Sequence, residues 1–317
     1  MDNYMTRDFG NIMANRAALC LVLVLLGTLP VVKAGDDGDW RSREVDVQSW
    51  EDGPELEGSP MDIPQAGDAV FVINVSYVPG HGQARVEGSI VIELFEQWAP
   101  NTTANMIEHI EQDLYDGIFF HRVIDDFVTQ SGDPTCRTVG VYPGTNPGCG
   151  NGGTGETIDL ELHPNLTHVD GAIGMARGMD IDSADSQWYI AETEAHNLDP
   201  ENREDGGYAT FGVVRDGMAH VRAIALTPTS DDPTGLAFVQ NPASSAGRPI
   251  YEAQITEMSM LGVIPSLNES QENNTIEVMS GEVMPTWVFL GAGTLLITLI
   301  GVASLLYARK VSEEELE

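Results

Sequence analysis

The sequence has little positive charge. Lysine and arginine number 15 against 49 aspartates and glutamates, which gives the chain a formal net charge of -34. A surface of this sign repels phosphate backbones and anionic lipid headgroups, so the composition argues against nucleic acid as a partner. The acidic residues are spread along the chain, which is typical of a solvated surface and not of a single acidic tail.

Sequence motifs of several enzyme classes are also absent. The chain contains no internal repeat of fixed period, no Walker loop, no Rossmann fingerprint, no His-Glu-x-x-His helix and no Gly-x-Ser-x-Gly elbow. These absences argue against nucleotide-binding, metalloprotease and hydrolase functions. The histidines nearest to Cys136 and Cys149, which are His163 and His168, form no recognised ligand spacing with them. We therefore expect no metal and no cofactor.

A long apolar run lies near each end of the chain. The first run, Ala17–Val32, is preceded by basic residues and followed by small residues that fit cleavage after Ala34. Residues 1–34 are interpreted as a signal peptide, with an uncleaved signal anchor as the alternative, because the run is short for a membrane span. Either interpretation places the following segment outside the cell.

The second run predicts a transmembrane helix at residues 285–308. It contains no charged residue, carries aromatic residues near its ends and is followed by Arg309 and Lys310. The basic pair favours a cytoplasmic tail at residues 309–317. We expect a cell-membrane protein with an extracellular domain, single-pass if the N-terminal signal is cleaved and two-pass if it is not.

Cysteine is scarce between the two apolar runs, where only Cys136 and Cys149 occur. A single pair outside the cell favours a disulfide that closes a loop of about fourteen residues, with two free thiols as the alternative. Glycosylation is expected for an exported domain at some of the Asn-x-Ser/Thr sequons, which lie at Asn74, Asn101, Asn165, Asn268 and Asn274.

The chain between the apolar runs divides into a leader, a domain and a tether. Residues 35–67 are rich in Asp, Glu, Gly, Ser and Pro without apolar periodicity, so we expect a flexible acidic leader. Residues 263–284 are polar and carry sequons, which is typical of a tether of low order. A folded domain is therefore expected at residues 68–262.

The central domain has the pattern of a mainly β fold. Ala69–Val78 and Gly88–Phe95 are rich in branched apolar residues and flank a Pro-Gly-His-Gly turn, which predicts a hairpin. A short helix is predicted from Pro100, with an apolar face formed by Ala104, Met106, Ile107 and Ile110. Further short strands are predicted at Gly117–Ile124, Val128–Ser131, Ala172–Ala176, Trp188–Ala191, Thr210–Val214 and Tyr251–Met260. Their spacing favours a closed antiparallel sheet.

The most specific pattern lies at Tyr115–Pro134, whose sequence YDGIFFHRVIDDFVTQSGDP closely resembles the cyclophilin signature. Further collinear matches occur at Gly88–Phe95, Ala99–Thr102, Gly150–Gly155, Gly171–Ala176, Ser186–Ile190, Leu198–Asp199 and Tyr208–Val214. The resemblance covers roughly residues 69–261. It implies a closed eight-stranded antiparallel barrel capped by two helices, and peptidyl-prolyl cis-trans isomerase activity on proline-containing polypeptides.

Isomerisation of an Xaa-Pro bond breaks no covalent bond, but the amide loses its resonance and crosses a barrier of about 18 to 20 kcal/mol. An enzyme for this step needs an apolar slot for the proline ring and a rigid donor that prefers the twisted amide. By resemblance, Arg122 is this donor, and Phe127 and Gln130 complete the catalytic set. The resemblance also implies substrate-binding residues at Val128, Ala176, Gln187, Tyr189, Leu198 and Tyr208.

Several residues depart from the cyclophilin pattern. Val128 replaces the usual methionine, Asn197 stands where tryptophan or phenylalanine is common, and Tyr208 replaces a histidine. Arg177 replaces an asparagine and adds a second cation near the expected path of the substrate backbone. His121 is interpreted as a packed, hydrogen-bonded core histidine and not as a catalyst.

These departures keep other functions open. A domain with a loosened ring pocket would act as a catalytically weak proline-peptide-binding or chaperone module. A structural surface protein is the third hypothesis, and it predicts no affinity for proline peptides. The retained Arg122, Phe127 and Gln130 favour the isomerase, whose expected role is the folding of exported proteins.

Overall fold

The computed structural model describes residues 39–230 and 247–266 of the chain. The predicted signal segment at residues 1–34, the transmembrane helix at residues 285–308, the cytoplasmic tail and most of the tether at residues 263–284 lie outside these ranges. Within the described ranges, no helix is long and apolar enough to cross a membrane.

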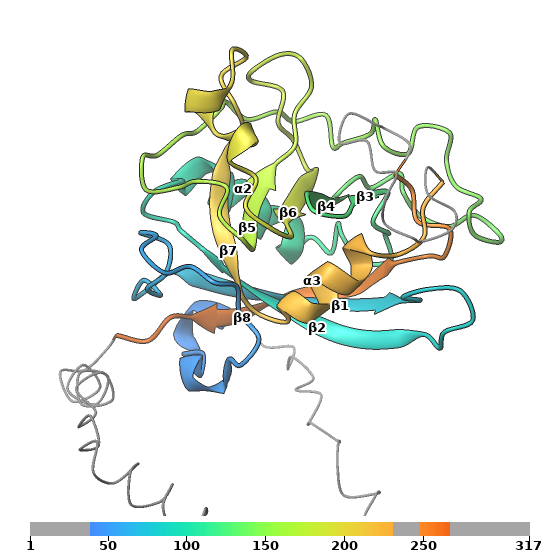
Figure 1. The fold of residues 1–317 in the computed structure, drawn as a ribbon. Helices are drawn as coiled ribbons and strands as arrows, with labels where there is room; N and C mark the ends of the chain where they lie inside the picture. Colours follow the sequence, from blue (N-terminus) through green and yellow to red (C-terminus); the bar gives the residue numbers. More distant parts are fainter. Residues whose placement is uncertain (1–38, 231–246, 267–317) are drawn as a thin grey trace, which may run out of the picture. The chain divides into compact units, whose positions relative to one another are not determined.

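An eight-stranded antiparallel sheet organises these residues (Figure 1). Its strands are β1 (Ala69–Tyr77), β2 (Val86–Leu94), β3 (Arg122–Ile124), β4 (Val128–Ser131), β5 (Ala172–Met175), β6 (Trp188–Ala191), β7 (Thr210–Asp216) and β8 (Gln254–Val263). Along the sheet they follow the order β3-β4-β6-β5-β7-β2-β1-β8. The predicted mainly β class is confirmed. The predicted hairpin is also confirmed as β1 and β2, which pair from Ala69 with Leu94 to Tyr77 with Val86.

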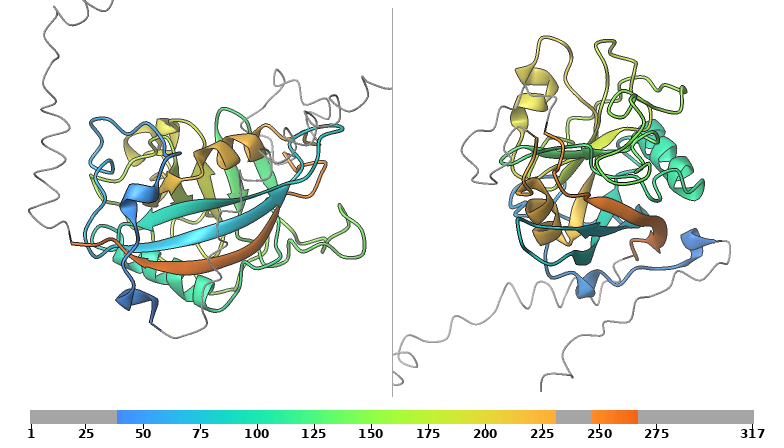
Figure 2. Two further views of the ribbon diagram at one scale, coloured as in Figure 1. Left: turned by 90° about the horizontal axis from the view of Figure 1, so that it is seen from below. Right: turned by 90° about the vertical axis from the view of Figure 1, so that its right-hand side faces the viewer.

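The sheet is strongly curled, and hydrogen bonds join residues near its two edges (Figure 2). Gly117 N donates to Ile255 O and Phe120 N donates to Ala253 O, each at 2.9 Å. The segment just before β3 therefore lies on β8, at the opposite end of the strand order. The predicted strand Gly117–Ile124 is in fact two pieces, because only the second piece, β3, pairs with β4.

The main hydrophobic core gathers apolar side chains from most of these strands and from both helices. Its largest buried side chains include Phe71, Phe95, Tyr115, Phe120, Trp188 and Phe211. Aromatic rings of this size each remove a large apolar area from water, so this core supplies much of the driving force for folding.

Two α-helices lie within the described ranges. Helix α2 (Pro100–Glu111) packs against β7 and β8, and helix α3 (Met218–Ala225) packs against β2, β3 and β4. The right-hand view of Figure 2 shows them on opposite sides of the sheet. Pro100 begins α2 as predicted, since the first helical position has no intrahelical partner for an N–H. Met106 is buried on the apolar face, whereas Ala104, predicted for the same face, is exposed.

The segment from residue 39 to residue 67 packs against the sheet, which differs from the flexible leader that its composition predicts. It contains two 3-10 helices, η1 (Trp40–Ser42) and η2 (Val47–Ser49). Val45 N donates to Val263 O at 3.0 Å, beside a parallel bridge between Glu44 and β8. Met61 is completely buried in the main core. The ordered chain therefore begins well before residue 68.

A buried ion pair holds the end of this segment. Arg215 Nε lies 2.5 Å from Glu93 Oε2, and the two Arg215 Nη atoms donate to the carbonyls of Asp62 and Met61 at 2.9 Å each. Glu93 Oε1 accepts from Gln65 N at 2.7 Å. Burial raises the pKa of Glu93, and the neighbouring Arg215 opposes this rise. These polar contacts help to order the segment. They join residues that are far apart in the sequence, so they leave no apolar periodicity from which the order could be predicted.

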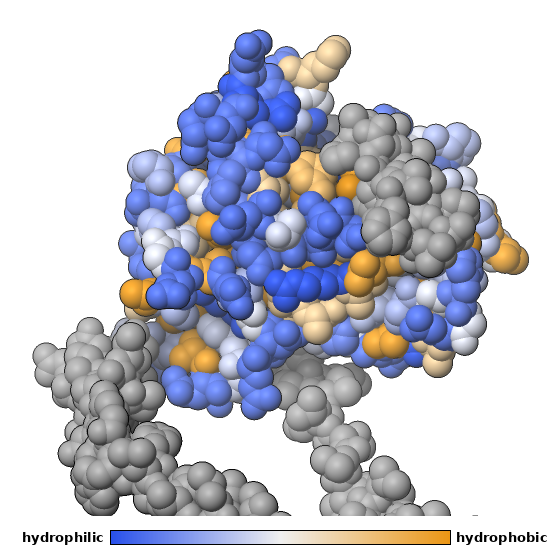
Figure 3. All heavy atoms as spheres, viewed as in Figure 1, coloured by the Kyte–Doolittle hydropathy of each residue, from blue (hydrophilic) through white to orange (hydrophobic). Residues whose placement is uncertain are grey.

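The face of the molecule seen in Figure 1 is predominantly polar. Figure 3 shows that the face seen in Figure 1 is mostly hydrophilic, with hydrophobic residues in separated patches. This distribution agrees with the acidic composition, because charged side chains spread over a surface interrupt any broad apolar area.

Candidate active site

The antiparallel pairing of β3 with β4 places Arg122 directly opposite Gln130. Side chains of directly paired residues lie on the same face of a sheet, and Arg122 Nη1 donates to Gln130 Oε1 at 3.4 Å. Gln130 Nε2 donates to Gln187 Oε1 at 3.0 Å, and Gln187 Nε2 donates to the carbonyl of Gly152 at 2.8 Å. This hydrogen-bond chain orients the half-buried guanidinium at the surface of the sheet.

A second apolar cluster lies outside the main core. Its buried members are Val128, Tyr189, Ala191, Ala195 and Leu198, and the half-buried Phe127, Ala176 and Tyr208 pack against them. We call this set the pocket cluster. The structure thus brings together all the apolar side chains that the sequence predicts for the proline pocket. Its half-buried members leave one side of the cluster open to solvent.

Strand geometry places the hydrogen-bond chain and the pocket cluster on one face. In β6, Trp188 and Ile190 belong to the main core, whereas Tyr189 between them belongs to the pocket cluster. Gln187 lies two residues before Tyr189 and so points to the same side as Tyr189. Tyr189 is also paired across the sheet with Gln130. Arg122 therefore lies on the same face of the sheet as the pocket cluster, beside its apolar side chains.

Two arginines hold Tyr208 at the rim of the pocket cluster. Arg177 and Arg203 place their guanidinium carbons 4.7 and 5.1 Å from the centre of the Tyr208 ring, distances at which a cation and an aromatic face attract. The Arg177 side chain is only 2% exposed and donates to the carbonyls of Asp205 and Gly207. Arg177 therefore supports the Tyr208 ring and the neighbouring backbone, a role that the sequence does not predict.

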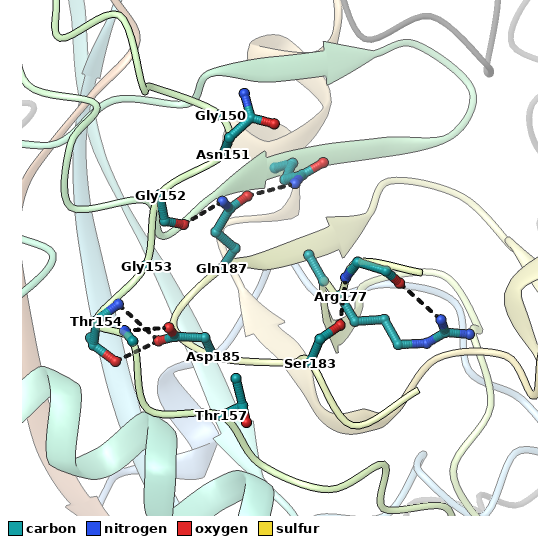
Figure 4. Close-up of a pocket in the computed structure, with 14 residues that line it drawn as sticks. Gly150, Asn151, Gly152, Gly153, Thr154, Thr157, Arg177, Ser183, Asp185 and Gln187 are labelled. Atoms are coloured by element: carbon teal, nitrogen blue, oxygen red, sulfur yellow. Dashed lines mark hydrogen bonds between the residues drawn. The ribbon is translucent and has the colours of Figure 1, made fainter. Parts of the chain in front are cut away.

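A polar cavity of about 590 Å³ adjoins the pocket cluster (Figure 4). It is lined by Gln130, Ala176, Arg177, Ser183, Asp185 and Gln187 and by residues of the glycine-rich segment 150–157. Figure 4 shows Gln187 reaching toward the Gly152 carbonyl and Asp185 pointing at Thr154. Asp185 Oδ1 accepts from Thr154 N and Oγ1 at 3.0 and 2.6 Å. The charge of Asp185 thus serves to fix the glycine-rich wall.

Cys136 and Cys149 form the disulfide that the sequence predicts. Together with Phe119 they make a small buried cluster, against which Tyr142 packs. Cys149 immediately precedes Gly150, the first residue of the cavity's glycine-rich wall. The disulfide therefore anchors the loop at the point where it enters this wall.

Asp133 supports the same wall, although sequence reasoning assigned it no role. Its carboxylate is buried, and Oδ2 accepts from the backbone N–H groups of Gly150 and Gly152 at 2.7 and 2.8 Å. Burial alone would raise the pKa of Asp133, but these hydrogen bonds and those from Thr135 bring it below its ordinary value. Asp133 thus fixes Gly152, whose carbonyl ends the chain from Arg122. Asp133 lies in the Ser-Gly-Asp-Pro run that ends the cyclophilin-like motif, and this position could have indicated its role from the sequence.

His121 is 5% exposed, and burial lowers its pKa to about 4. A side chain that exchanges protons during catalysis at neutral pH needs a pKa near 7. The burial and the low pKa therefore support the interpretation of His121 as a packed histidine. The predicted hydrogen bond is not found, because neither ring nitrogen has a hydrogen-bond partner among the described residues.

Comparison with known protein families agrees with this geometry. The family model described as cyclophilin type peptidyl-prolyl cis-trans isomerase/CLD matches residues 82–257, more than half of the chain. The chain belongs to the cyclophilin family. The enzyme class that follows is peptidyl-prolyl cis-trans isomerase, as the resemblance in the sequence implies.

Curated relatives match the cyclophilin domain. A peptidyl-prolyl cis-trans isomerase of Schizosaccharomyces pombe is 35% identical over 151 residues, which are 46% of this chain and 86% of that protein. One of Acinetobacter baylyi is 35% identical over 143 residues, which are 45% of this chain and 70% of that protein.

Solved cyclophilin structures are also similar to this chain. A cyclophilin type peptidyl-prolyl cis-trans isomerase of Cryptosporidium parvum has a TM-score of 0.45 at 22% identity, covering 61% of this chain and 97% of that chain. A second structure of that protein, in the presence of the dipeptide Ala-Pro, has a TM-score of 0.42 at 23% identity, covering 61% of this chain and 99% of that chain.

Proposed function

We propose that this cyclophilin accelerates the isomerisation of Xaa-Pro bonds in exported proteins, outside the cell, and that Arg122 stabilises the twisted amide. One observation carries the proposal: the Arg122 guanidinium, oriented by Gln130 and Gln187, lies on the same face as the pocket cluster. An apolar surface beside an oriented cation is what a twisted prolyl amide requires, because its ring is apolar and its nitrogen gains a localised lone pair.

In this mechanism the proline ring enters the pocket cluster from its half-buried side, where Tyr208 forms the rim, and packs against Phe127, Val128, Tyr189 and Leu198. As the amide twists, Arg122 donates to the proline nitrogen or to the neighbouring carbonyl. Gln130 holds Arg122 and the substrate backbone, and Gln187 binds the backbone beside them. No covalent bond breaks and no proton moves, so the rate depends on how much better the site binds the twisted amide than the planar one.

The cellular setting belongs to the same proposal. The apolar runs at Ala17–Val32 and residues 285–308 support export and attachment to the cell membrane. The disulfide between Cys136 and Cys149 supports an oxidising compartment, where such bonds persist. We interpret the curled sheet as the closed barrel of cyclophilins, and the hydrogen bonds between the segment before β3 and β8 support this interpretation.

The test is a protease-free assay that follows the relaxation of a cis-enriched Xaa-Pro peptide in the presence of the purified full chain. We expect wild-type activity and a loss of about 100-fold in kcat/KM for Arg122→Ala, since removing one preorganised donor from an active site costs about 100- to 1,000-fold. Arg122→Lys keeps the charge but loses the planar fork, so it should recover only part of the activity. Arg41→Ala is the matched control, because Arg41 pairs with Glu96 at an exposed site.

A catalytically weak proline-binding module is the second candidate function. Asn197 is exposed and adds no apolar wall to the pocket cluster, and the valine at position 128 is shorter than the usual methionine. This hypothesis predicts a proline peptide that binds with a measurable Kd while its isomerisation rate stays uncatalysed. A folded wild-type chain that binds the proline peptide without turnover, at both low and high salt, would decide against the enzyme mechanism and for this alternative.

A further inference from the structure

A buried chain of hydrogen bonds lies behind the pocket cluster. Tyr189 Oη lies 2.7 Å from His168 Nε2, and His168 Nδ1 lies 2.6 Å from Asp199 Oδ1. The second carboxylate oxygen, Asp199 Oδ2, lies 2.7 Å from His196 Nδ1. The side chains of His168 and Asp199 are 0% and 1% exposed, whereas that of His196 is 45% exposed.

The direction of these hydrogen bonds follows from the chemistry of the groups. Burial alone would raise the pKa of Asp199, but hydrogen bonds from His168 and His196 bring it below its ordinary value, so the group is a carboxylate that only accepts. His168 Nδ1 therefore donates to it, which leaves Nε2 facing the Tyr189 hydroxyl. Burial raises the pKa of Tyr189 well above its ordinary value, so the phenol keeps its proton and pairs with Nε2 as a neutral hydroxyl.

These contacts fix the Tyr189 ring from several sides. The His168 ring is stacked on it with centroids 5.8 Å apart and planes at 15°, and the Tyr208 ring meets it edge-on at 6.2 Å. A Cβ added at Gly174 would come within 2.5 Å of Tyr189 Oη, so only glycine leaves room for the phenol there. Phenylalanine would serve as well as tyrosine if position 189 supplied only an apolar wall. Burying the Tyr189 hydroxyl costs free energy unless it has a hydrogen-bond partner, and His168 is that partner.

The same chain ties Tyr189 to the opposite part of the pocket cluster. Asp199 directly follows Leu198, and its carboxylate also accepts from His168 N at 2.9 Å. Ala195 N, in turn, donates to His168 O at 2.8 Å. His168 thus bonds through its ring to Tyr189 and through its backbone to the segment that carries Ala195 and Leu198.

We propose that His168 and Asp199 are positioning residues for the proline pocket: they hold the Tyr189 ring and the Leu198 segment at the separation that admits the pyrrolidine ring. This inference rests on the proposed function, since it takes the pocket cluster as the proline site. Neither residue belongs to the Arg122 chain. Their loss therefore acts on substrate binding more than on the chemical step.

The test compares His168→Leu, Tyr189→Phe and the double variant in the full chain, with kcat and KM measured separately for an Xaa-Pro peptide. Each single change leaves a buried polar group without its partner, and we expect KM to rise about tenfold with kcat within about twofold of wild type. In the double variant an apolar pair replaces Tyr189 and His168, while Asp199 keeps its hydrogen bonds to His168 N and His196 Nδ1. KM should therefore return part of the way to the wild-type value, below that of the His168→Leu single variant. His163→Leu is the control and should change neither constant, because His163 stacks on Trp98 outside the pocket cluster.

The KM pattern separates positioning from a merely structural role. If the single variants lower the melting temperature but leave KM within twofold, or if the double variant only adds their effects, the inference is overturned. Tyr189→Phe keeps the ring volume, so it preserves the test should His168→Leu fail to fold. Wild-type turnover decides the proposed function separately. If the wild type binds proline peptide without turnover, the same comparison is made on Kd by calorimetry, and a wild type that does neither overturns both proposals.

Discussion

The substitution Arg215→Met tests the contacts that order the segment from residue 39 to residue 67. Arg215 is 7% exposed and Glu93 is 0% exposed, so their ion pair lies almost entirely out of water. Methionine keeps the approximate length and apolar packing of the arginine stem. It removes the positive charge and the two donors that serve the carbonyls of Met61 and Asp62.

The expected loss follows from what remains buried. Removing one partner of a buried ion pair costs about 3 to 5 kcal/mol, because the other charge is left uncompensated. Each carbonyl that loses its donor adds about 1 kcal/mol. Glu93 limits the total by taking up a proton, since burial already raises its pKa. We expect the free energy of unfolding to fall by about 5 kcal/mol at pH 8 and by less at pH 5, where protonation of Glu93 costs less.

Urea denaturation at both pH values measures this loss. Arg41→Met is the matched control, because Arg41 pairs with Glu96 at 2.9 Å and the two side chains are 50% and 24% exposed. An exposed pair contributes about 1 kcal/mol or less. Adding Glu93→Gln to Arg215→Met should recover part of the stability at pH 8. A loss for Arg215→Met no larger than that of the control would refute the reasoning.

Two further predictions concern pH and the disulfide. Burial, with help from Glu93 and Glu96, raises the pKa of Asp68 from 3.8 to about 8, so between about pH 4 and pH 8 the folded state holds a proton that the unfolded state has released. The free energy of unfolding therefore falls by about 1.4 kcal/mol per pH unit as pH rises through this window. Asp68→Asn should abolish this contribution in urea titrations, and an unchanged slope would contradict it. Cys136→Ser removes the crosslink to Cys149 and should cost about 3 kcal/mol on the loop-entropy model; wild-type protein in reductant should show the same loss, and equal stability with and without reductant would argue against it.

The sequence predicts most of the sheet because its strands alternate between the main core and an outer face. The predicted strands Val128–Ser131 and Trp188–Ala191 coincide with β4 and β6. The last strand begins later than predicted, at Gln254, because its pairing with β1 begins there, opposite Ser76. Pairing between strands that are far apart in sequence decides this boundary, and no local pattern records it.

The sequence predicts those residues of the candidate site that lie within motifs of the cyclophilin family. Arg122, Gln130 and all members of the pocket cluster except Ala191 and Ala195 lie inside the matched motifs, and the structure brings them together. His168 lies 31 positions from Asp199 and 21 from Tyr189, so their hydrogen bonds leave no periodic trace in the sequence. The same holds for Glu93 and Arg215, which are 122 positions apart and whose pairing makes an acidic, aperiodic segment ordered.

The pairing of β1 with β8 has a consequence for protein synthesis. Ala69 lies opposite Val263, almost at the other end of the domain. A ribosome adds about 5 to 20 residues per second, so one edge of β1 stays without its partner for on the order of 10 to 40 s after translation of β1. An unpaired apolar strand edge favours aggregation. The nascent chain of this isomerase therefore exposes that edge of β1 until its last strand has emerged.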